Sequence, residues 1–387
     1  MSSTTFDAVP WRDSKRYVWP LGAVAMGLPL YGYALVQLTG WAVFWWLGLA
    51  FVYLAIPTMD WIFGTDASNP PEVRVPSLVK ERYYRYAVYA AIPVEYAVFT
   101  WGIAMAVNGG LPWYSVLGLV LSVGGILGLS INVAHELGHA TDPLERWLAK
   151  IALAPVAYGH FFTEHNRGHH VRVATPEDPA SSRFGETFWA FLPRSVFGSV
   201  RSAWAIERER LRRNGRGVWS WDNQNLQAWA MTVVLFAVMT VWLGWIALPY
   251  MLVTAVYGFS LLEVVNYLEH YGLQRQKRAD GSYERCRPEH SWNSNHIVTN
   301  VLLYHLQRHS DHHANPTRSY QALRNFDDVP QLPSGYASMI LLAYVPPLWF
   351  RVMNPRVVAH YRGDMRRANI EPSIRAQVLA RHAPAAA

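Results

Sequence analysis

The sequence predicts an all-α integral membrane protein in which six transmembrane helices carry a cytosolic cap of helices and loops with a histidine-rich dimetal site. Three observations predict this class. Charged residues make up only 16% of the 387 residues, whereas soluble domains carry roughly 25%. Apolar runs of about 20 residues recur, which is the length that a helix needs to cross a hydrocarbon core. All 15 histidines lie after residue 134.

The chain is expected to be a single membrane domain over residues 1–387, built on six apolar segments. These segments are residues 17–39, 41–64, 86–107, 112–134, 228–248 and 250–270. All 34 Lys and Arg lie outside the short turns that join them in pairs, in residues 1–16, 65–85, 135–227 and 269–387. Because Lys-rich and Arg-rich loops stay in the cytosol, both termini and the long loops are predicted to be cytosolic. The first segment is too long for a signal peptide, and no small-residue cleavage site follows it.

Two long segments, residues 135–227 and 271–387, are expected to form the cap. The first is interrupted by three proline pairs: Asp142-Pro143, Thr175-Pro176 and Asp178-Pro179. Since proline ends or kinks a helix, short helices and loops are expected there. The second contains an apolar stretch at 336–352 that is interrupted by Pro346-Pro347. This stretch is too short to span a membrane and is expected to lie in the interface.

Cysteine content and net charge limit the chemistry that the chain can contain. The single cysteine, Cys286, excludes a disulfide framework. It also excludes an iron–sulfur or rubredoxin site within the chain, because such sites need several thiolates. The net charge of +7 has two interpretations. It is the usual cytosolic excess of cations in a membrane protein, and it would also suit the docking of an acidic protein partner.

Nine histidines gather after the cytosolic ends of the fourth and sixth segments and in two further motifs. The motifs are HELGHA with His135 and His139, EHNRGHH with His165, His169 and His170, NYLEHYG with His270, and QRHSDHH with His309, His312 and His313. His135 and His139 are four residues apart, so they share one helical face and can bind one metal. Nine candidate ligands on one side of a membrane predict a metal centre.

Nine imidazoles are more than one metal can bind. Two metals with four or five histidines each, and a position left open for O2, account for the number. Neutral imidazole suits iron, copper and zinc alike, so the identity of the metal does not follow from ligand type alone.

Several other polar residues are expected to support this site. His290 and His296, in the motif EHSWNSNH, are expected to support it or to bind metal. The carboxylates beside the ligands are Glu136, Glu164, Glu269 and Asp311. Metal-bound imidazoles usually donate their second N–H to such a group; the alternative for each is a solvated surface charge. Glu263, seven residues before His270 in the last apolar segment, is expected to face the site from inside the bundle.

The fourth apolar segment offers a route for an apolar substrate. Gly124, Leu127, Gly128 and Ile131 lie on the same face as His135, and the missing side chains at the glycines would leave a slot that leads to the metals. The alternative is close helix packing, because two small residues four apart are also the pattern of tightly packed transmembrane helices.

The HELGH motif at residues 135–139 has a competing interpretation. It fits the H-E-x-x-H pattern of zinc peptidases, with Glu136 as the general base. Such an intramembrane protease needs one further ligand and leaves seven clustered histidines unexplained. A metal transporter would need ligands at the middle of the membrane, whereas these histidines gather at one face.

Four stretches closely resemble the membrane-bound alkane 1-monooxygenases. They are HELGH at 135–139, EHNRGHHVRVATPEDPASSRFGE at 164–186, NYLEHYGLQR at 266–275 and LQRHSDHHANPTRSYQ at 306–321. The resemblance extends over roughly residues 20–360, and the second and fourth motifs are long enough to be specific. One departure is Ala140, where members often carry Lys. That position is not a ligand.

The resemblance implies terminal hydroxylation of medium- or long-chain n-alkanes by O2 at two non-haem irons bound by the nine histidines. It implies a multi-pass protein of the bacterial inner membrane that receives electrons from rubredoxin, with rubredoxin reductase and NADH upstream. No dinucleotide fingerprint occurs in this chain, and haem, flavin, a nicotinamide site and nucleic-acid binding are not expected. A membrane fatty-acyl desaturase or a sterol-type hydroxylase, which also use histidine boxes, is the alternative within the same chemistry.

Overall fold

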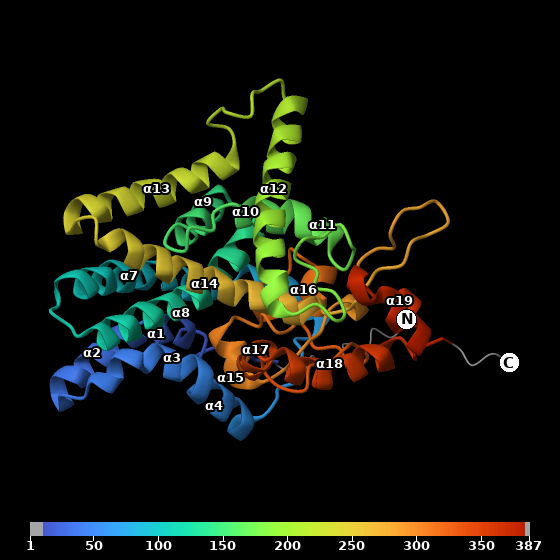
Figure 1. Cartoon of the computed structure of the whole chain (residues 1–387), viewed down its shortest axis with the longest axis horizontal. Coiled ribbons are helices and arrows are strands. Elements are labelled where there is room, and N and C mark those ends of the chain that lie inside the picture. Colours follow the sequence, from blue (N-terminus) through green and yellow to red (C-terminus); the bar gives the residue numbers. More distant parts are fainter. Residues whose placement is uncertain (1–10, 384–387) are drawn as a thin grey trace, which may run out of the picture.

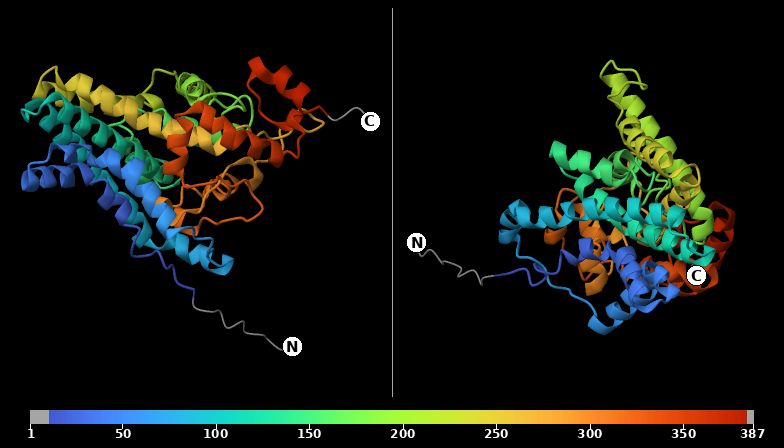
Figure 2. Two further views of the ribbon diagram at one scale, coloured as in Figure 1. Left: turned by 60° about the horizontal axis from the view of Figure 1, so that its bottom comes forward. Right: turned by 90° about the vertical axis from the view of Figure 1, so that its left-hand side faces the viewer.

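The computed structural model describes residues 11–383 and confirms the helical membrane class. Within these residues the only β pairing is four isolated bridges. Five helical stretches are long and apolar enough to cross a membrane: Ala42–Phe63, Arg82–Asn108, α8 (Trp113–Gly138), α13 (Gln224–Leu243) and α14 (Ala247–His270). Short turns join these helices at one end of the bundle, and the cap lies at the other end (Figure 1). Both described ends of the chain lie on the cap side (Figure 2).

Two of the five stretches are composite. The first consists of η1 (Ala42–Trp46), α3 (Leu47–Ala50), η2 (Phe51–Ala55) and α4 (Ile56–Phe63), and the second of α6 (Arg82–Tyr89) and α7 (Ala91–Asn108). The segment expected at residues 17–39 is built differently. It forms α1 (Leu21–Ala25) and α2 (Leu28–Thr39), which are separated by a turn at Met26 and Gly27. Twelve helical residues rise only about 18 Å, so α2 is too short to cross a hydrocarbon core by itself.

Helix α8 is the central element of the bundle, because it is the most deeply buried of the five stretches. It packs closely against α14 through two glycines. A Cβ atom at Gly124 would lie 2.9 Å from the backbone oxygen of Thr254, and one at Gly128 would lie 2.8 Å from that of Gly258. The small-residue pattern of the sequence therefore serves helix packing at both positions.

The first cap segment follows α8. It contains α9 (Pro143–Ala152), α10 (Phe161–Glu164), the π-helical η4 (His165–His169), α11 (His170–Arg172) and α12 (Phe188–Arg213). The expectation of short helices was wrong for α12, which has 26 residues and runs across the end of the bundle (Figure 1). Its buried residues recur at helical spacing from Phe188 to Leu211. Pro193 lies inside the second turn of the helix, where it removes one backbone hydrogen bond without ending the helix.

The second cap segment follows α14 and contains mostly short elements. They are η5 (Pro288–His290), α15 (Ile297–Leu302), α16 (His309–Ala314), η6 (Tyr320–Ala322), α17 (Tyr336–Ala343), α18 (Pro346–His360), η7 (Met365–Arg367), η8 (Pro372–Ile374) and α19 (Arg375–Arg381). The apolar stretch around residue 345 is bent by 120° between α17 and α18. Two small elements, η3 (Glu72–Arg74) and α5 (Val75–Lys80), precede α6.

Candidate metal centre

Two membrane helices carry the first candidate ligand histidines to the cap end of the bundle. His135 lies in the last turn of α8 and His139 directly follows that helix, so the two residues are one helical turn apart on one face. His270 is the last residue of α14 and is fully buried. Because α8 and α14 pack side by side along their length, their ends bring these residues to the same depth.

The histidines of the first cap segment depend on a π-helical turn. Residues His165–His169 form η4, and His170 begins α11. A π-helix bonds residue i to residue i+5 and frequently occurs at functional sites. The wider turn aligns His165 with His170, whose Nε2 atoms lie 3.0 Å apart. His169 points into a different group of side chains.

The last three histidines lie on the short helix α16 after a strained turn. Tyr304 and His305 both have positive φ angles, 47° and 57°, which is uncommon for side chains of this size. The turn is held by a hydrogen bond of 2.9 Å that His305 Nδ1 donates to the backbone oxygen of Tyr320. This arrangement places His309 at the start of α16 and His312 and His313 in its last turn.

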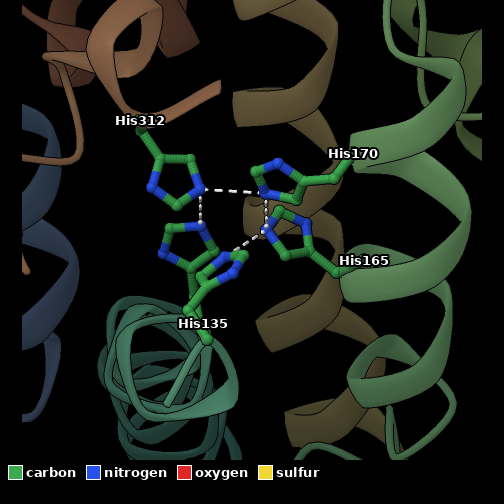
Figure 3. A group of neighbouring side chains, drawn as sticks. His135, His165, His170 and His312 are labelled. Atoms are coloured by element: carbon green, nitrogen blue, oxygen red, sulfur yellow. Dashed lines mark hydrogen bonds between the residues drawn. The ribbon is translucent and has the colours of Figure 1, made fainter. Parts of the chain in front are cut away.

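The nine histidines predicted as ligands form two groups. His135, His139, His165, His170 and His312 form the five-histidine group, and His169, His270, His309 and His313 form the four-histidine group. Within each group the ligand nitrogens all lie within 4.8 Å of one another. In the first group, the Nε2 atom of His312 lies 3.0 Å from those of both His135 and His170, and the rings converge on one point (Figure 3). In the second, His313 Nε2 lies 2.8 Å from His309 Nε2 and 3.2 Å from His169 Nε2.

This geometry fits metal ions. Two nitrogens bound at right angles to one metal at about 2.1 Å are about 3.0 Å apart, which matches these spacings. His165 Nε2 faces the Nε2 atoms of both His139 and His170, and neutral imidazoles cannot all donate to one another through the same ring position. In addition, both ring nitrogens of His270 are buried and have no hydrogen-bond partner among the described residues.

Burial keeps six of the candidate ligands neutral. Loss of solvation lowers the pKa of His139 to about 3. The same cause, together with neighbouring histidines, lowers the pKa well below the usual range for His165, His170, His309, His312 and His313. A metal therefore meets imidazoles that have no proton to release at neutral pH.

One carboxylate that contacts a candidate ligand was not predicted from the sequence. Asp178 is fully buried, and its Oδ2 accepts a 2.9 Å hydrogen bond from Nδ1 of His169. Such a contact fixes the ring and leaves Nε2 for the metal. The sequence did contain a signal for this contact, because Asp178 lies in the same long motif as His169, within the Asp178-Pro179 pair.

Of the predicted supporting carboxylates, only Glu269 forms a contact with a candidate ligand histidine. Its Oε2 lies 3.1 Å from His309 Nε2, and its Oε1 accepts a 2.8 Å hydrogen bond from Tyr336. The other four have different partners. Glu136 accepts from the backbone N–H of Tyr320, Glu164 pairs with Arg172, Glu263 accepts from Tyr158, and Asp311 pairs with Arg318.

His290 and His296 lie outside both histidine groups. His290 Nδ1 accepts a hydrogen bond from the backbone N–H of Arg287, and His296 Nδ1 lies 2.8 Å from the Ser294 hydroxyl. Both side chains therefore stabilise the loop that precedes α15, and neither lies among the candidate ligands.

A narrow cavity of about 50 Å³ leads from the apolar bundle to both groups. Its polar end contains Asn132, His135, His165, Asn266, Glu269 and His309. The remaining lining residues are Val52, Gly128, Leu129, Phe161, Leu261, Leu262, Val265, Leu303, Leu306 and Ile340. Of the four residues predicted to form a slot, only Gly128 lines this cavity; Leu127 and Ile131 are fully buried in the bundle core.

Comparison with known proteins identifies the family. Residues 111–343 match the family model described as fatty acid desaturase. The chain is 47% identical to an alkane 1-monooxygenase of Pseudomonas putida over 97% of this chain and 94% of the relative. It is 48% identical to an alkane 1-monooxygenase of Acinetobacter baylyi over 95% of this chain and 91% of the relative. The chain belongs to the alkane 1-monooxygenase family.

A more distant relative of this alkane 1-monooxygenase family is also similar to the chain. It is the xylene/toluene monooxygenase hydroxylase component of Pseudomonas putida, which is 29% identical over 62% of this chain and 63% of the relative. The predicted family is therefore confirmed. The match to the desaturase model describes the wider family to which the chain is similar.

Proposed function

We propose that the chain is an alkane 1-monooxygenase that converts medium- and long-chain n-alkanes to 1-alkanols. The reaction consumes one O2, two electrons and two protons, and releases one water. The observation that carries the proposal is the apolar cavity whose polar end meets histidines of both groups. An alkane has no polar handle, so recognition must come from the shape of such a cavity and from apolar contact.

The nine histidines are proposed to hold two irons, one in the five-histidine group and one in the four-histidine group. When bound, the irons supply the activation of O2. The chain itself positions the alkane and excludes water from the site. Val265 lies one helical turn before Glu269 on α14 and Leu129 lies on α8, and both line the route to the histidines. The terminal methyl of an alkane that enters end first would reach the ligand groups before any other carbon.

We also propose an electron donor and a cellular location for the protein. The single cysteine leaves no thiolate cluster within the chain, so we assign electron supply to rubredoxin, with its reductase and NADH upstream. We also propose that the protein lies in a bacterial inner membrane with its termini and metal centre in the cytosol. This orientation is supported by the Lys and Arg residues, which avoid the turns at the opposite end of the bundle.

Metal content and products, measured on one purified sample in nanodiscs, would test the proposal. Rubredoxin, its reductase and NADH would be added under air with a mixture of n-alkanes. We expect two irons per chain and 1-alkanols as products. One zinc per chain without any alcohol would contradict the proposal and favour the peptidase interpretation of HELGH. Unsaturated fatty-acyl products would favour a desaturase.

Narrowing the cavity at two depths should change the range of alkanes that react. Val265 and Leu262 lie on the same helix as Glu269, about 6 Å and 10 Å along the axis from it. In Leu262→Trp we expect loss of the longer alkanes while the shorter ones still react, whereas Val265→Phe should suppress them all. Each excluded CH2 forfeits about 0.8 kcal/mol of burial. The measurement is the product distribution from an equimolar series of alkanes.

The matched control is Leu252→Trp on the same helix, because Leu252 is 48% exposed on the outer face. Its product distribution should equal that of the unchanged protein. Gly128 is less suitable for this test, since a side chain there meets the backbone of α14. Equal distributions for all three variants would show that alkanes reach the site by another route.

A further inference from the structure

Two of the nine candidate ligands, His139 and His170, are partly exposed, and the other seven are buried. His139 lies in a recess lined by Lys80, Arg85, Glu136 and Glu145, beside the start of the stretch Arg82–Asn108. His170 is different, because the next residue, Val171, has 65% of its surface exposed. An exposed apolar side chain therefore directly follows a candidate ligand on the outside of the cap.

A hairpin of residues 275–285 is fixed beside Val171. The Arg275 guanidinium donates a 2.9 Å hydrogen bond to the backbone oxygen of Val171. Lys277 and Tyr283 form an antiparallel bridge, and the Tyr283 hydroxyl donates to Glu177 at 3.1 Å. The loop between α14 and η5 projects from the cap next to α11 (Figure 1). The hairpin and the ligand-bearing segment therefore form one continuous surface.

The hairpin carries an excess of positive charge. Lys277, Arg278 and Arg285 are exposed, and none of them forms an ion pair with another residue of the described range 11–383. The nearest acids of the hairpin have local partners: Asp280 accepts from Ser282, and Glu284 pairs with Arg287. We call Val171, Lys277, Arg278 and Arg285 the hairpin surface.

We propose that the hairpin surface docks a small acidic one-electron carrier protein, which passes electrons through Val171 and His170 into the five-histidine group. The inference rests on the proposed function, because monooxygenation consumes two external electrons. Each docking event oxidises one carrier by one electron, so two events supply the pair, and the two protons come from solvent. Transient redox partners use small contacts, and complementary charges steer their encounter.

The recess at His139 suits this role less well. His139 lines a concave site that also contains two acidic residues, Glu136 and Glu145, beside the basic residues Lys80, Arg85 and Arg318. A folded protein would meet the rim of the recess, whereas at the hairpin surface it would meet the residue next to a ligand. The two partly exposed candidate ligands, His139 and His170, thus mark two alternative docking positions that can be compared in one protein.

Charge reversal on the hairpin would test the proposal. In Lys277→Glu/Arg278→Glu we expect the Kd and the KM for reduced rubredoxin at low salt to rise by at least about tenfold. The kcat at saturating rubredoxin should stay within about twofold, and the salt dependence of Kd should weaken. Iron content and alkanol formation driven by a chemical reductant should not change. Binding is measured without alkane, so the result does not depend on turnover.

The matched control is Lys80→Glu/Arg82→Glu, which makes the same change of charge beside the His139 recess. We expect its rubredoxin Kd and KM to equal those of the unchanged protein. Weaker binding in the control alone, or no change in either variant, would overturn the assignment of the docking surface. If instead the unchanged protein forms no alkanol even with the chemical reductant, the proposed function fails, and the Kd values still decide whether the surface docks the carrier.

Discussion

His312→Ala and His313→Ala are expected to remove different metals, although the two residues are adjacent in the chain. His312 belongs to the five-histidine group and His313 to the four-histidine group. Each variant should retain about one iron per chain and lose alkanol formation by at least about a thousandfold, which is roughly 4 kcal/mol of barrier. Mössbauer spectra of samples loaded with ⁵⁷Fe should show the loss of a different component in each variant.

The control for this pair is His360→Ala. His360 is half-buried at the end of α18 and packs against Tyr361, outside both histidine groups. This variant should keep two irons and nearly full activity. If both adjacent variants lost the same spectral component, or if both lost all iron, the division into two separate groups would be wrong.

Replacement of Asp178 by asparagine should weaken the four-histidine group without removing a ligand. The carboxylate holds His169 through Nδ1 at 2.9 Å and also accepts a hydrogen bond from Ser181. Asparagine keeps the shape but loses the charge that favours the bound ring. Changes of this kind cost about 10- to 100-fold in metal affinity or activity. We therefore expect Asp178→Asn to lose one of two irons faster than the unchanged protein during dialysis against a chelator.

The neighbouring acid provides a control for Asp178. Glu177 is exposed, and its carboxylate accepts a hydrogen bond from Tyr283 on the surface. Glu177→Gln should release iron at the rate of the unchanged protein. Equal rates for both variants would mean that the contact between Asp178 and His169 does not stabilise bound metal.

Much of the architecture could be predicted from the sequence. Hydropathy located the cores of five membrane-crossing stretches, and the absence of Lys and Arg identified the turns that join them. The segment at residues 17–39 was harder, because its apolar composition is continuous while a turn at Gly27 divides the helix. The length of α12 was underestimated for a different reason. Proline pairs interrupt the cap segment, but they lie before the long stretch with helical periodicity.

The candidate site was predictable as a set of residues but not as an arrangement. Spacing alone pairs His135 with His139, since an α-helix puts residues four apart on one face. It could not show that His169 and His170 belong to different groups. That separation depends on the π-helical turn of η4 and on the packing of α16 against the bundle ends. Asp178 was missed because the sequence places several acids near the ligands, and only the fold selects among them.

The position of α16 has a consequence for synthesis of the protein. Both histidine groups include histidines of α16, which follows every other segment that contributes to them. While the ribosome is still making earlier residues, the five-histidine group lacks His312 and the four-histidine group lacks both His309 and His313. Neither group can be complete before translation has passed residue 313. If the proposed function is correct, we therefore expect iron loading to be a late event in biogenesis, and a nascent chain that stops earlier to leave membrane helices with incomplete histidine groups.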